Sequence, residues 1–276
     1  MRVLVTGYLG CVGRALTEHL LSEGHTVIGV DITFPSEAND NVESHVASMM
    51  DYDALYKVVS STKPDGIVHL AGLLYQTKKP EHEIFAGNTC GTYNVLTCAE
   101  KCGIKRVVLA SSINAIGSLF SDPKRYKYFP IDEDHPLEPQ DGYSLSKQFN
   151  ELTADAFIRR VPDMSIVSLR FHYVVVSKKV AKDEALNRDK KVVGGDLFAY
   201  TRADASAKAC LKGLQVPWKG HDFFFIVAPE NVLDEDSESL RKEFYPDVPT
   251  LRPLKGTQGF WNCSKAKALL SWSHDD

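Results

Sequence analysis

The first 31 residues combine features that strongly restrict the fold. Residues 2–6 are short, apolar and β-branched, as expected for a buried parallel strand. A glycine-rich loop, residues 7–13, leads into an amphipathic helix that ends near Glu23, and a second strand over residues 26–30 runs into Asp31. A strand, glycine loop, helix, strand and acid within about 30 residues predict a βαβ unit that binds a dinucleotide.

Each glycine of this loop has an expected role. Gly7 permits a tight turn, Gly10 lets the backbone approach a pyrophosphate, and Gly13 lets the helix pack closely on the strand. The N-terminus of the helix then faces the phosphates. The Asp31 carboxylate can bond both ribose hydroxyls and would repel a 2′-phosphate, so the sequence favours NAD over NADP. The alternative is a glycine loop with a purely structural role.

Strands and helices alternate through the rest of the first 170 residues. The expected strands cover residues 43–47, 66–70, 105–110 and 164–170, and the expected helices cover 51–60, 80–101 and 142–160. This alternation predicts the α/β class with a doubly wound parallel sheet, the Rossmann fold.

The pattern loosens beyond Phe171. Further helices are expected near residues 204–214, 235–244 and 264–271, with one strand over 222–227. We therefore expect residues 1–172 to form an NAD-binding domain. Residues 173–276 are expected to form a small substrate-binding portion packed on it, and not an independent domain.

A second motif, Tyr143-Ser-Leu-Ser-Lys147, stands at the start of the helix expected over 142–160. Residues four apart share a helix face, so the ammonium lies one turn from the phenol. An isolated Tyr titrates near pH ~10. A neighbouring ammonium favours the phenolate, which would make this Tyr useful in proton exchange. Taken alone, the pair is a weak signal, and a solvated Lys beside a half-buried Tyr is its more common meaning.

Two other segments bear on the site. Residues 117–141 are polar, rich in Pro and aromatic residues and without periodicity, and they directly precede the Tyr143 helix. They are expected to form a substrate-side loop, with Phe129 on an apolar wall, the alternative being a solvated excursion. His69 lies inside an apolar strand, so we interpret it as a packed, hydrogen-bonded histidine.

Composition excludes several function classes. The 276 residues are 43% hydrophobic and 25% charged with a net charge of −4, as in an ordinary globular protein. Lys and Arg are dispersed, so no nucleic-acid surface is expected. No apolar run approaches the ~20 residues of a membrane span, and no signal peptide is seen. The six cysteines form no C-x-x-C pair, which predicts a reducing, cytoplasmic location and no metal site.

Together these motifs resemble the extended short-chain dehydrogenase/reductase superfamily, in its NAD-dependent epimerase/dehydratase group. The resemblance covers about residues 1–230. The motifs that carry it are Gly7/Gly10/Gly13, Asp31, His69-Leu-Ala-Gly72, Asn88, Ser111-Ser112, Tyr143/Lys147 and Leu169-Arg170. It implies a reaction in which hydride passes to or from the nicotinamide while Tyr143 exchanges a proton with a substrate oxygen.

The resemblance also assigns roles to single residues. Ser112 is implied to bond the same substrate oxygen, Lys147 to bond the nicotinamide ribose and lower the Tyr143 pKa, and Asn88 to hold a water or the helix geometry behind Lys147. The expected cofactor-binding residues are Gly7, Leu9, Gly10, Cys11, Val12, Gly13, Asp31, Ser48, Met49, Leu70, Ala71, Gly72, Asn88, Tyr143 and Lys147. The expected substrate-binding residues are Tyr75, Ser112, Ile113, Asn114, His172 and Arg202.

The sequence departs from the family pattern in three places. Ser48 stands where an acid commonly meets adenine, so adenine contacts are expected to be weaker or to come from the Met49 backbone. The Ile-Asn-Ala after Ser112 lacks the Asp-Glu pair of the 4,6-dehydratases, which disfavours dehydration. The chain after Lys147 is shorter than nucleotide-sugar epimerases usually have for gripping the nucleotide.

In layout the chain most resembles the uronate and sugar dehydrogenases, including the stretch 111–117 and the terminal aromatic residues 260–272. The Arg with which those enzymes hold a carboxylate falls at Gly195. Arg202, a few residues further on, could substitute for it, as could Lys190 or Lys191.

Three hypotheses follow. The first is an NAD-dependent oxidoreductase that acts on the secondary alcohol or carbonyl of a small molecule (a sugar, a sugar acid or a secondary-metabolite intermediate). The second is an epimerase or isomerase that uses tightly bound NAD in an internal redox cycle. The third, a non-catalytic dinucleotide-binding regulator, has no need of the Ser/Tyr/Lys set. The resemblance also implies a homodimer that packs through the two long helices near 80–101 and 142–160.

Overall fold

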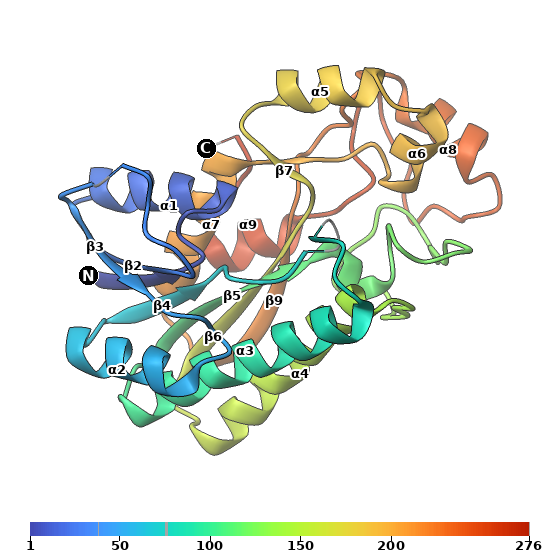
Figure 1. The fold of residues 1–276 in the computed structure, drawn as a ribbon. Helices are drawn as coiled ribbons and strands as arrows, with labels where there is room; N and C mark the ends of the chain where they lie inside the picture. The colour runs from blue at the N-terminus through green and yellow to red at the C-terminus, as the bar shows by residue number, and fades with distance from the viewer. Residues whose placement is uncertain (38, 75–76, 276) are drawn as a thin grey trace.

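The computed structural model describes residues 1–37, 39–74 and 77–275. A seven-stranded parallel sheet, in the order β3-β2-β1-β4-β5-β6-β9, forms its centre (Figure 1). The strands are β1 (Arg2–Thr6), β2 (Thr26–Asp31), β3 (Val42–Val46), β4 (Gly66–His69), β5 (Arg106–Ser112), β6 (Ser165–Phe171) and β9 (Gly220–Ile226). The order reverses between β1 and β4, the point at which doubly wound sheets bind ligands. The predicted α/β class and doubly wound sheet are therefore confirmed.

Helices cover both faces of the sheet. One face carries α2 (Tyr52–Thr62), α3 (Glu81–Lys101) and α4 (Gly142–Arg160), and the other carries α1 (Cys11–Ser22), α7 (Ala203–Leu214) and α9 (Ser264–Leu270) (Figure 1). Their apolar stripes pack on both faces of the sheet, so nearly every residue of β1, β4 and β6 is buried. The long helices α3 and α4 lie side by side on the outside of the molecule.

The C-terminal part is more structured than the sequence indicated. Three helices gather in it, at the upper right of Figure 1: α5 (Lys178–Leu186), α6 (Lys190–Gly195) and α8 (Ser237–Phe244). Two short strands, β7 (Val174–Val175) and β8 (Thr201–Arg202), pair in parallel. The sequence pattern did not indicate α5, α6, β7 or β8. Helix α5 buries only two alanines and α6 ends in two glycines, so neither has the apolar periodicity of a long core helix.

The loop over residues 117–141 is anchored in this C-terminal part. Phe129 forms a parallel bridge with Thr250, and Ile131 forms one with Trp261. Both loop residues are fully buried, and the Phe129 ring packs edge-on against Phe260 at a centroid distance of 5.1 Å. Phe129 is thus a core residue, which corrects the expectation that it lines a pocket wall, and this stretch of the loop is not a solvated excursion.

Within the described ranges, no helix combines the length and the apolar character that crossing a bilayer requires.

Candidate active site

The glycine loop is shaped by close backbone approaches. Gly7 has φ +71°, and a Cβ there would lie 2.7 Å from the backbone nitrogen of Ala71. A Cβ on Gly13 would lie 2.3 Å from the Gly7 carbonyl oxygen. Side chains are therefore excluded at both positions by the protein itself.

Gly10 is constrained differently. The nearest atom to its ideal Cβ is the Gly7 oxygen at 3.3 Å, so a methyl group would require a shift of only a few tenths of an ångström. Gly10 is the N-cap of α1 and no side chain caps this helix, which leaves its first-turn N–H groups without helical acceptors. A bare, uncapped helix N-terminus fits the pyrophosphate of a dinucleotide. Leu9, Cys11 and Val12, the other residues expected there, lie at this same turn.

Asp31 is held beside the glycine loop. Its Oδ2 accepts a hydrogen bond of 3.1 Å from the Leu9 amide, and its Oδ1 accepts one of 2.8 Å from the Ile32 amide. Each carboxylate oxygen keeps a lone pair that can accept from a ribose hydroxyl. The chain therefore has the groups that NAD requires, a bare phosphate cradle next to a ribose-binding carboxylate.

The other expected cofactor residues surround this edge of the sheet. Ser48 caps the turn before α2 by accepting from the Met50 amide at 3.1 Å, and the Met49 carbonyl accepts from Asn94 at 2.9 Å. The Leu70 and Ala71 amides donate to Thr6, which draws the chain after β4 close to Gly7. A Cβ on Gly72 would lie 3.8 Å from the Lys147 Nζ, so this turn lies between the glycine loop and Lys147.

The three expected catalytic side chains come together at the carboxyl end of β5. Ser112 is the last residue of that strand. Asp141 caps α4 by accepting from the Ser144 amide at 2.9 Å, which starts the helix just before Tyr143. The Lys147 Nζ donates to the Ala110 carbonyl at 2.8 Å and lies 5.6 Å from the centroid of the Tyr143 ring.

Burial dominates the electrostatics of this group. It raises the pKa of Tyr143, while a hydrogen bond with Ser112 acts in the opposite direction. It also lowers the pKa of Lys147 to about 8, against the charge of Glu151, which raises it. The net shift of the Tyr143 pKa is thus upward, opposite in direction to the lowering expected from Lys147, because burial disfavours the phenolate.

His69 behaves as interpreted from the sequence. Its Nδ1 lies 2.7 Å from the Thr6 hydroxyl, and burial together with the Lys147 charge lowers its pKa to about 3. It is a neutral, packed residue.

Asn88 connects three segments of the site. Its Oδ1 accepts from the Leu73 amide at 2.7 Å, and its Nδ2 donates to the Leu73 carbonyl at 3.0 Å and to the Ser146 hydroxyl at 3.1 Å. Ser146 in turn donates to the Tyr143 carbonyl at 2.6 Å. This geometry matches the helix-holding alternative expected for Asn88, and it engages both amide hydrogens within the protein.

Ile113 and Asn114 form the 3₁₀ turn η2 (Ile113–Ile116) directly after Ser112. The Asn114 amide donates to the Ser112 Oγ at 3.2 Å, and its Oδ1 accepts from the Leu119 amide at 2.9 Å. The next residue, Phe120, packs edge-on against Tyr143 at a centroid distance of 5.9 Å. The loop thus begins as a cover over the Tyr143 ring, a contact that no spacing rule in the sequence indicates.

The remaining substrate-side predictions have mixed placements. His172 is buried; its Nδ1 accepts from the Tyr173 amide at 2.7 Å and its Nε2 donates to the Asp196 carbonyl at 2.9 Å, so the protein occupies both nitrogens. Arg202 forms ion pairs with Asp204 and Asp275, at 3.0 and 3.5 Å. Tyr75 lies outside the described residues.

The structure also shows the contacts of Lys190 and of Gly195, the position at which the carboxylate-binding Arg of the uronate dehydrogenases was expected. Lys190 pairs with Glu235 and Glu243 at 2.9 and 3.3 Å. A Cβ on Gly195 would lie 3.5 Å from the Cε of Lys124, a loop residue that the sequence analysis did not consider. A Cβ at Gly195 would thus be in ordinary van der Waals contact with that lysine.

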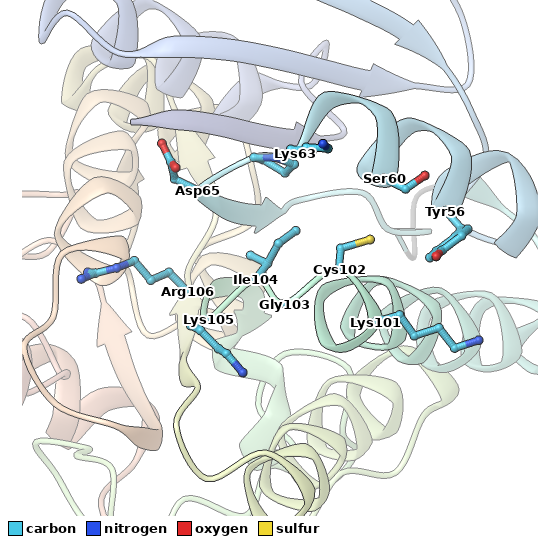
Figure 2. A pocket seen from close by; sticks show the side chains of 11 residues that line it. Tyr56, Ser60, Lys63, Asp65, Lys101, Cys102, Gly103, Ile104, Lys105 and Arg106 are labelled. Atoms are coloured by element: carbon cyan, nitrogen blue, oxygen red, sulfur yellow. The ribbon is translucent and has the colours of Figure 1, made fainter.

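A cavity of about 520 Å³ lies at the amino ends of β4 and β5, opposite the carboxyl ends at which Ser112 lies (Figure 2). Four cationic residues line it, but their charged ends point in different directions: Lys63, Lys101, Lys105 and Arg106. Helices α2 and α3 end here, where positive charge offsets the helix dipoles. This cavity is separate from the glycine loop and the Tyr143 group.

The chain is similar in sequence to a known protein family and to several known proteins. A model of the NAD dependent epimerase/dehydratase family matches residues 3–188. A uronate dehydrogenase of Pseudomonas syringae pv. tomato is 32% identical over 170 residues, which cover 61% of this chain and 58% of that protein. A UDP-glucose 4-epimerase of Mycolicibacterium smegmatis is 32% identical over 162 residues, which cover 55% and 50%. The matches span less than two thirds of the length of either relative.

Solved structures share the whole fold at lower identity. A UDP-glucose 4-epimerase of Thermotoga maritima with UDP-glucose superposes with a TM-score of 0.75 at 19% identity, covering 99% of this chain and 94% of that one. A short-chain dehydrogenase/reductase superfamily protein of Agrobacterium tumefaciens with bound NAD gives 0.73 at 23% identity, covering 100% and 94%. A mutated uronate dehydrogenase gives 0.67 at 23%, covering 99% and 94%.

Proposed function

This chain belongs to the NAD-dependent epimerase/dehydratase family, and from that premise we propose that it transfers a hydride between NAD and a secondary alcohol or carbonyl of a small sugar or sugar acid. The observation that carries the proposal is the meeting of Ser112, Tyr143 and Lys147 at the sheet edge that also bears the glycine loop. A pair of hydroxyls beside a buried ammonium is suited to proton exchange at one substrate oxygen.

Each residue would have a distinct task. Asp31 would accept from the adenosine ribose, and the N-terminus of α1 would hold the pyrophosphate. NAD supplies hydride transfer when it is bound. Tyr143 would give a proton to the substrate oxygen or take one from it, Ser112 would hydrogen-bond that oxygen, and a charged Lys147 would favour the phenolate.

The burial of Tyr143 supports this assignment. Phe120 covers its ring, and the side chain is only 9% exposed. Exclusion of water strengthens hydrogen bonds to a bound substrate and keeps the proton from being lost to solvent.

An internal redox reaction is the second candidate. The solved UDP-glucose 4-epimerase of Thermotoga maritima shares the fold over 94% of its own chain, so a chain of this length does not by itself separate epimerase from dehydrogenase. The two differ in how they handle the cofactor. An epimerase can keep NAD through its cycle, whereas a dehydrogenase must release it.

The test is the near-ultraviolet absorbance of reduced nicotinamide, followed with NAD and a panel of aldoses, uronates and apolar secondary alcohols. Growth of the band with one substrate class, abolished in Tyr143→Phe, is the expected result. A flat trace with NAD retained through purification would favour epimerisation or isomerisation. NAD binding without turnover of either kind would favour the regulator, and no NAD binding would overturn both enzyme proposals.

We also propose that the partner is a second copy of this chain. The outer surfaces of α3 and α4 carry large apolar side chains that are about half exposed: Tyr93 (49%), Phe149 (43%) and Leu152 (53%). Apolar residues gathered on two adjacent helices suit the packing of two copies face to face.

A further inference from the structure

A buried carboxylate lies directly behind the catalytic group. Glu151 of α4 accepts from Arg170 of β6 through both oxygens, at 2.9 Å from Nε and 2.8 Å from Nη2. The same Oε1 accepts from the Ser111 hydroxyl at 2.6 Å. The Arg170 and Glu151 side chains are 0% and 6% exposed. This is the bidentate geometry in which an Arg–carboxylate pair is strongest.

The aromatic residues of β9 hold the arginine in place. Its guanidinium lies 4.0 Å from the ring centroid of Phe223 and 5.1 Å from that of Phe225. Among the described residues its Nη1 has no hydrogen-bond partner, so its charge is answered chiefly by Glu151. Glu151 is the carboxylate that hydrogen-bonds this buried cation, whereas Glu133 feels the Arg170 charge as a Coulomb interaction.

The position of Glu151 in the sequence connects it to the reaction. Tyr143, Lys147 and Glu151 are spaced four apart and share one face of α4. Ser111 directly precedes Ser112 on β5. One carboxylate therefore bonds the strand that ends in Ser112 and extends from the helix that carries the other two catalytic side chains.

We infer that Glu151 is a positioning residue, which fixes the Ser112 strand against the Tyr143–Lys147 helix and supplies the negative charge facing Lys147, with Arg170 as its buried counter-ion. The inference rests on the proposed function, because Glu151 acts only through the residues that function assigns.

The surroundings of Lys147 single out this carboxylate. His69 of β4 faces Lys147 and is neutral. The Ala110 carbonyl of β5 accepts a hydrogen bond from the Lys147 ammonium, and Tyr143 lies one turn before Lys147 on α4. Glu151 is the group whose charge raises the Lys147 pKa against burial. Asp141 acts on Tyr143 instead. Without Glu151, a smaller fraction of the Lys147 side chains would be charged at neutral pH.

The experiment follows the carbon-13 shift of Lys147 Cε against pH in lysine-labelled, cofactor-free protein, with Lys147→Arg to assign the signal. In Glu151→Gln the titration midpoint is expected to move to lower pH. This single variant leaves Arg170 unpaired and can unfold. The double variant Glu151→Gln with Arg170→Met removes both charges and keeps the volume, so it is expected to fold and still show a lowered midpoint.

A matched control changes a carboxylate on the neighbouring helix. Glu100 of α3 pairs with Arg160 of α4 at the exposed end of the same helix pair, away from Lys147. Glu100→Gln is expected to leave the Lys147 midpoint unchanged. Ser111→Ala, which removes a hydrogen bond but no charge, separates the two contributions of Glu151.

The outcomes distinguish this inference from the proposed function. A folded double variant with the wild-type Lys147 midpoint would reduce Glu151 to a structural residue and overturn the inference. If the midpoint falls and the wild type catalyses hydride transfer, kcat of the double variant is expected to fall about 10-fold or more while the KM for NAD is kept. If the midpoint falls but the wild type neither binds NAD nor turns over, the proposed function fails and the catalytic meaning of Glu151 fails with it.

Discussion

Asn88 of α3 donates a hydrogen bond of 3.1 Å to the hydroxyl of Ser146, the residue before Lys147 on α4. The same side chain exchanges two hydrogen bonds with the Leu73 backbone. One amide therefore ties the turn after β4 to α4, the helix that carries Tyr143 and Lys147.

Asn88→Asp tests this link with almost no change in volume. The new oxygen would face the Leu73 carbonyl and lose both donated hydrogen bonds, which costs about 1–3 kcal/mol for a buried polar group. We expect a lower thermal unfolding midpoint and a lower kcat, measured by calorimetry and by the nicotinamide assay. Thr89→Val, on the same helix with its hydroxyl bonded only to its own helix, is the control. Equal losses in both variants would contradict the specific role of Asn88.

Gly13 and Gly10 are expected to respond differently to the same change. In Gly13→Ala the new methyl would lie 2.3 Å from the Gly7 oxygen, so the loop must shift and the protein should lose stability. In Gly10→Ala the closest approach is 3.3 Å, so the fold should survive while NAD affinity falls at least ~10-fold, or ~1.4 kcal/mol. Thermal unfolding and calorimetric NAD titration measure the two effects. Unchanged NAD binding in Gly10→Ala would argue against a pyrophosphate at this turn.

Asp31→Asn should weaken the choice of NAD over NADP. The amide keeps an oxygen for the Leu9 amide but loses the charge that accepts from ribose and repels a 2′-phosphate. Because a charged hydrogen bond contributes about 1.5–3 kcal/mol, we expect NAD affinity to fall roughly 10- to 100-fold and the ratio of NAD to NADP affinity to shrink. Titration with both cofactors checks this, and an unchanged ratio would count against the assignment.

Asp155 contributes stability that depends on pH. The His221 Nδ1 donates to it at 2.7 Å, and this hydrogen bond lowers its pKa in the folded protein. A lowered carboxylate pKa gives stability that is present above the unfolded value, about 3.9, and is lost as pH falls through the folded value. The unfolding midpoints of wild type and Asp155→Asn should therefore differ at neutral pH and converge below about pH 4. A constant difference across this range would contradict the assignment.

The proposed dimer is tested by a charge on its expected face. Leu152→Glu places a carboxylate among the exposed apolar residues of α3 and α4 and should halve the mass found by sedimentation equilibrium. Leu251→Glu alters a leucine that is 65% exposed elsewhere and should leave the mass unchanged. A monomeric wild type would overturn the proposal directly.

The sequence predicted the first 172 residues well because their signals are local. Short segments rich in Val, Ile and Leu mark β1, β4, β5 and β6, and glycines mark the turn that α1 follows. The Tyr143–Lys147 spacing is likewise local, since a single helix sets it.

What the sequence could not supply depends on contacts between distant segments. Arg170 appeared only as part of a motif, because its pairing with Glu151 and its contact with β9 need the folded sheet. Burial, which sets the pKa of Tyr143, is equally invisible from spacing. One signal was available: Glu151 lies four residues beyond Lys147, on the face already assigned to catalysis.

The bridges from Phe129 to Thr250 and from Ile131 to Trp261 also have a consequence during synthesis. All the strands that bear the glycine loop, Asp31 and Ser112 precede β6 in the chain, whereas the bridged part of the loop that follows Ser112 must wait for Thr250 and Trp261 to be synthesised. The groups expected to hold NAD are thus synthesised before the loop that begins over Tyr143 gains its anchors.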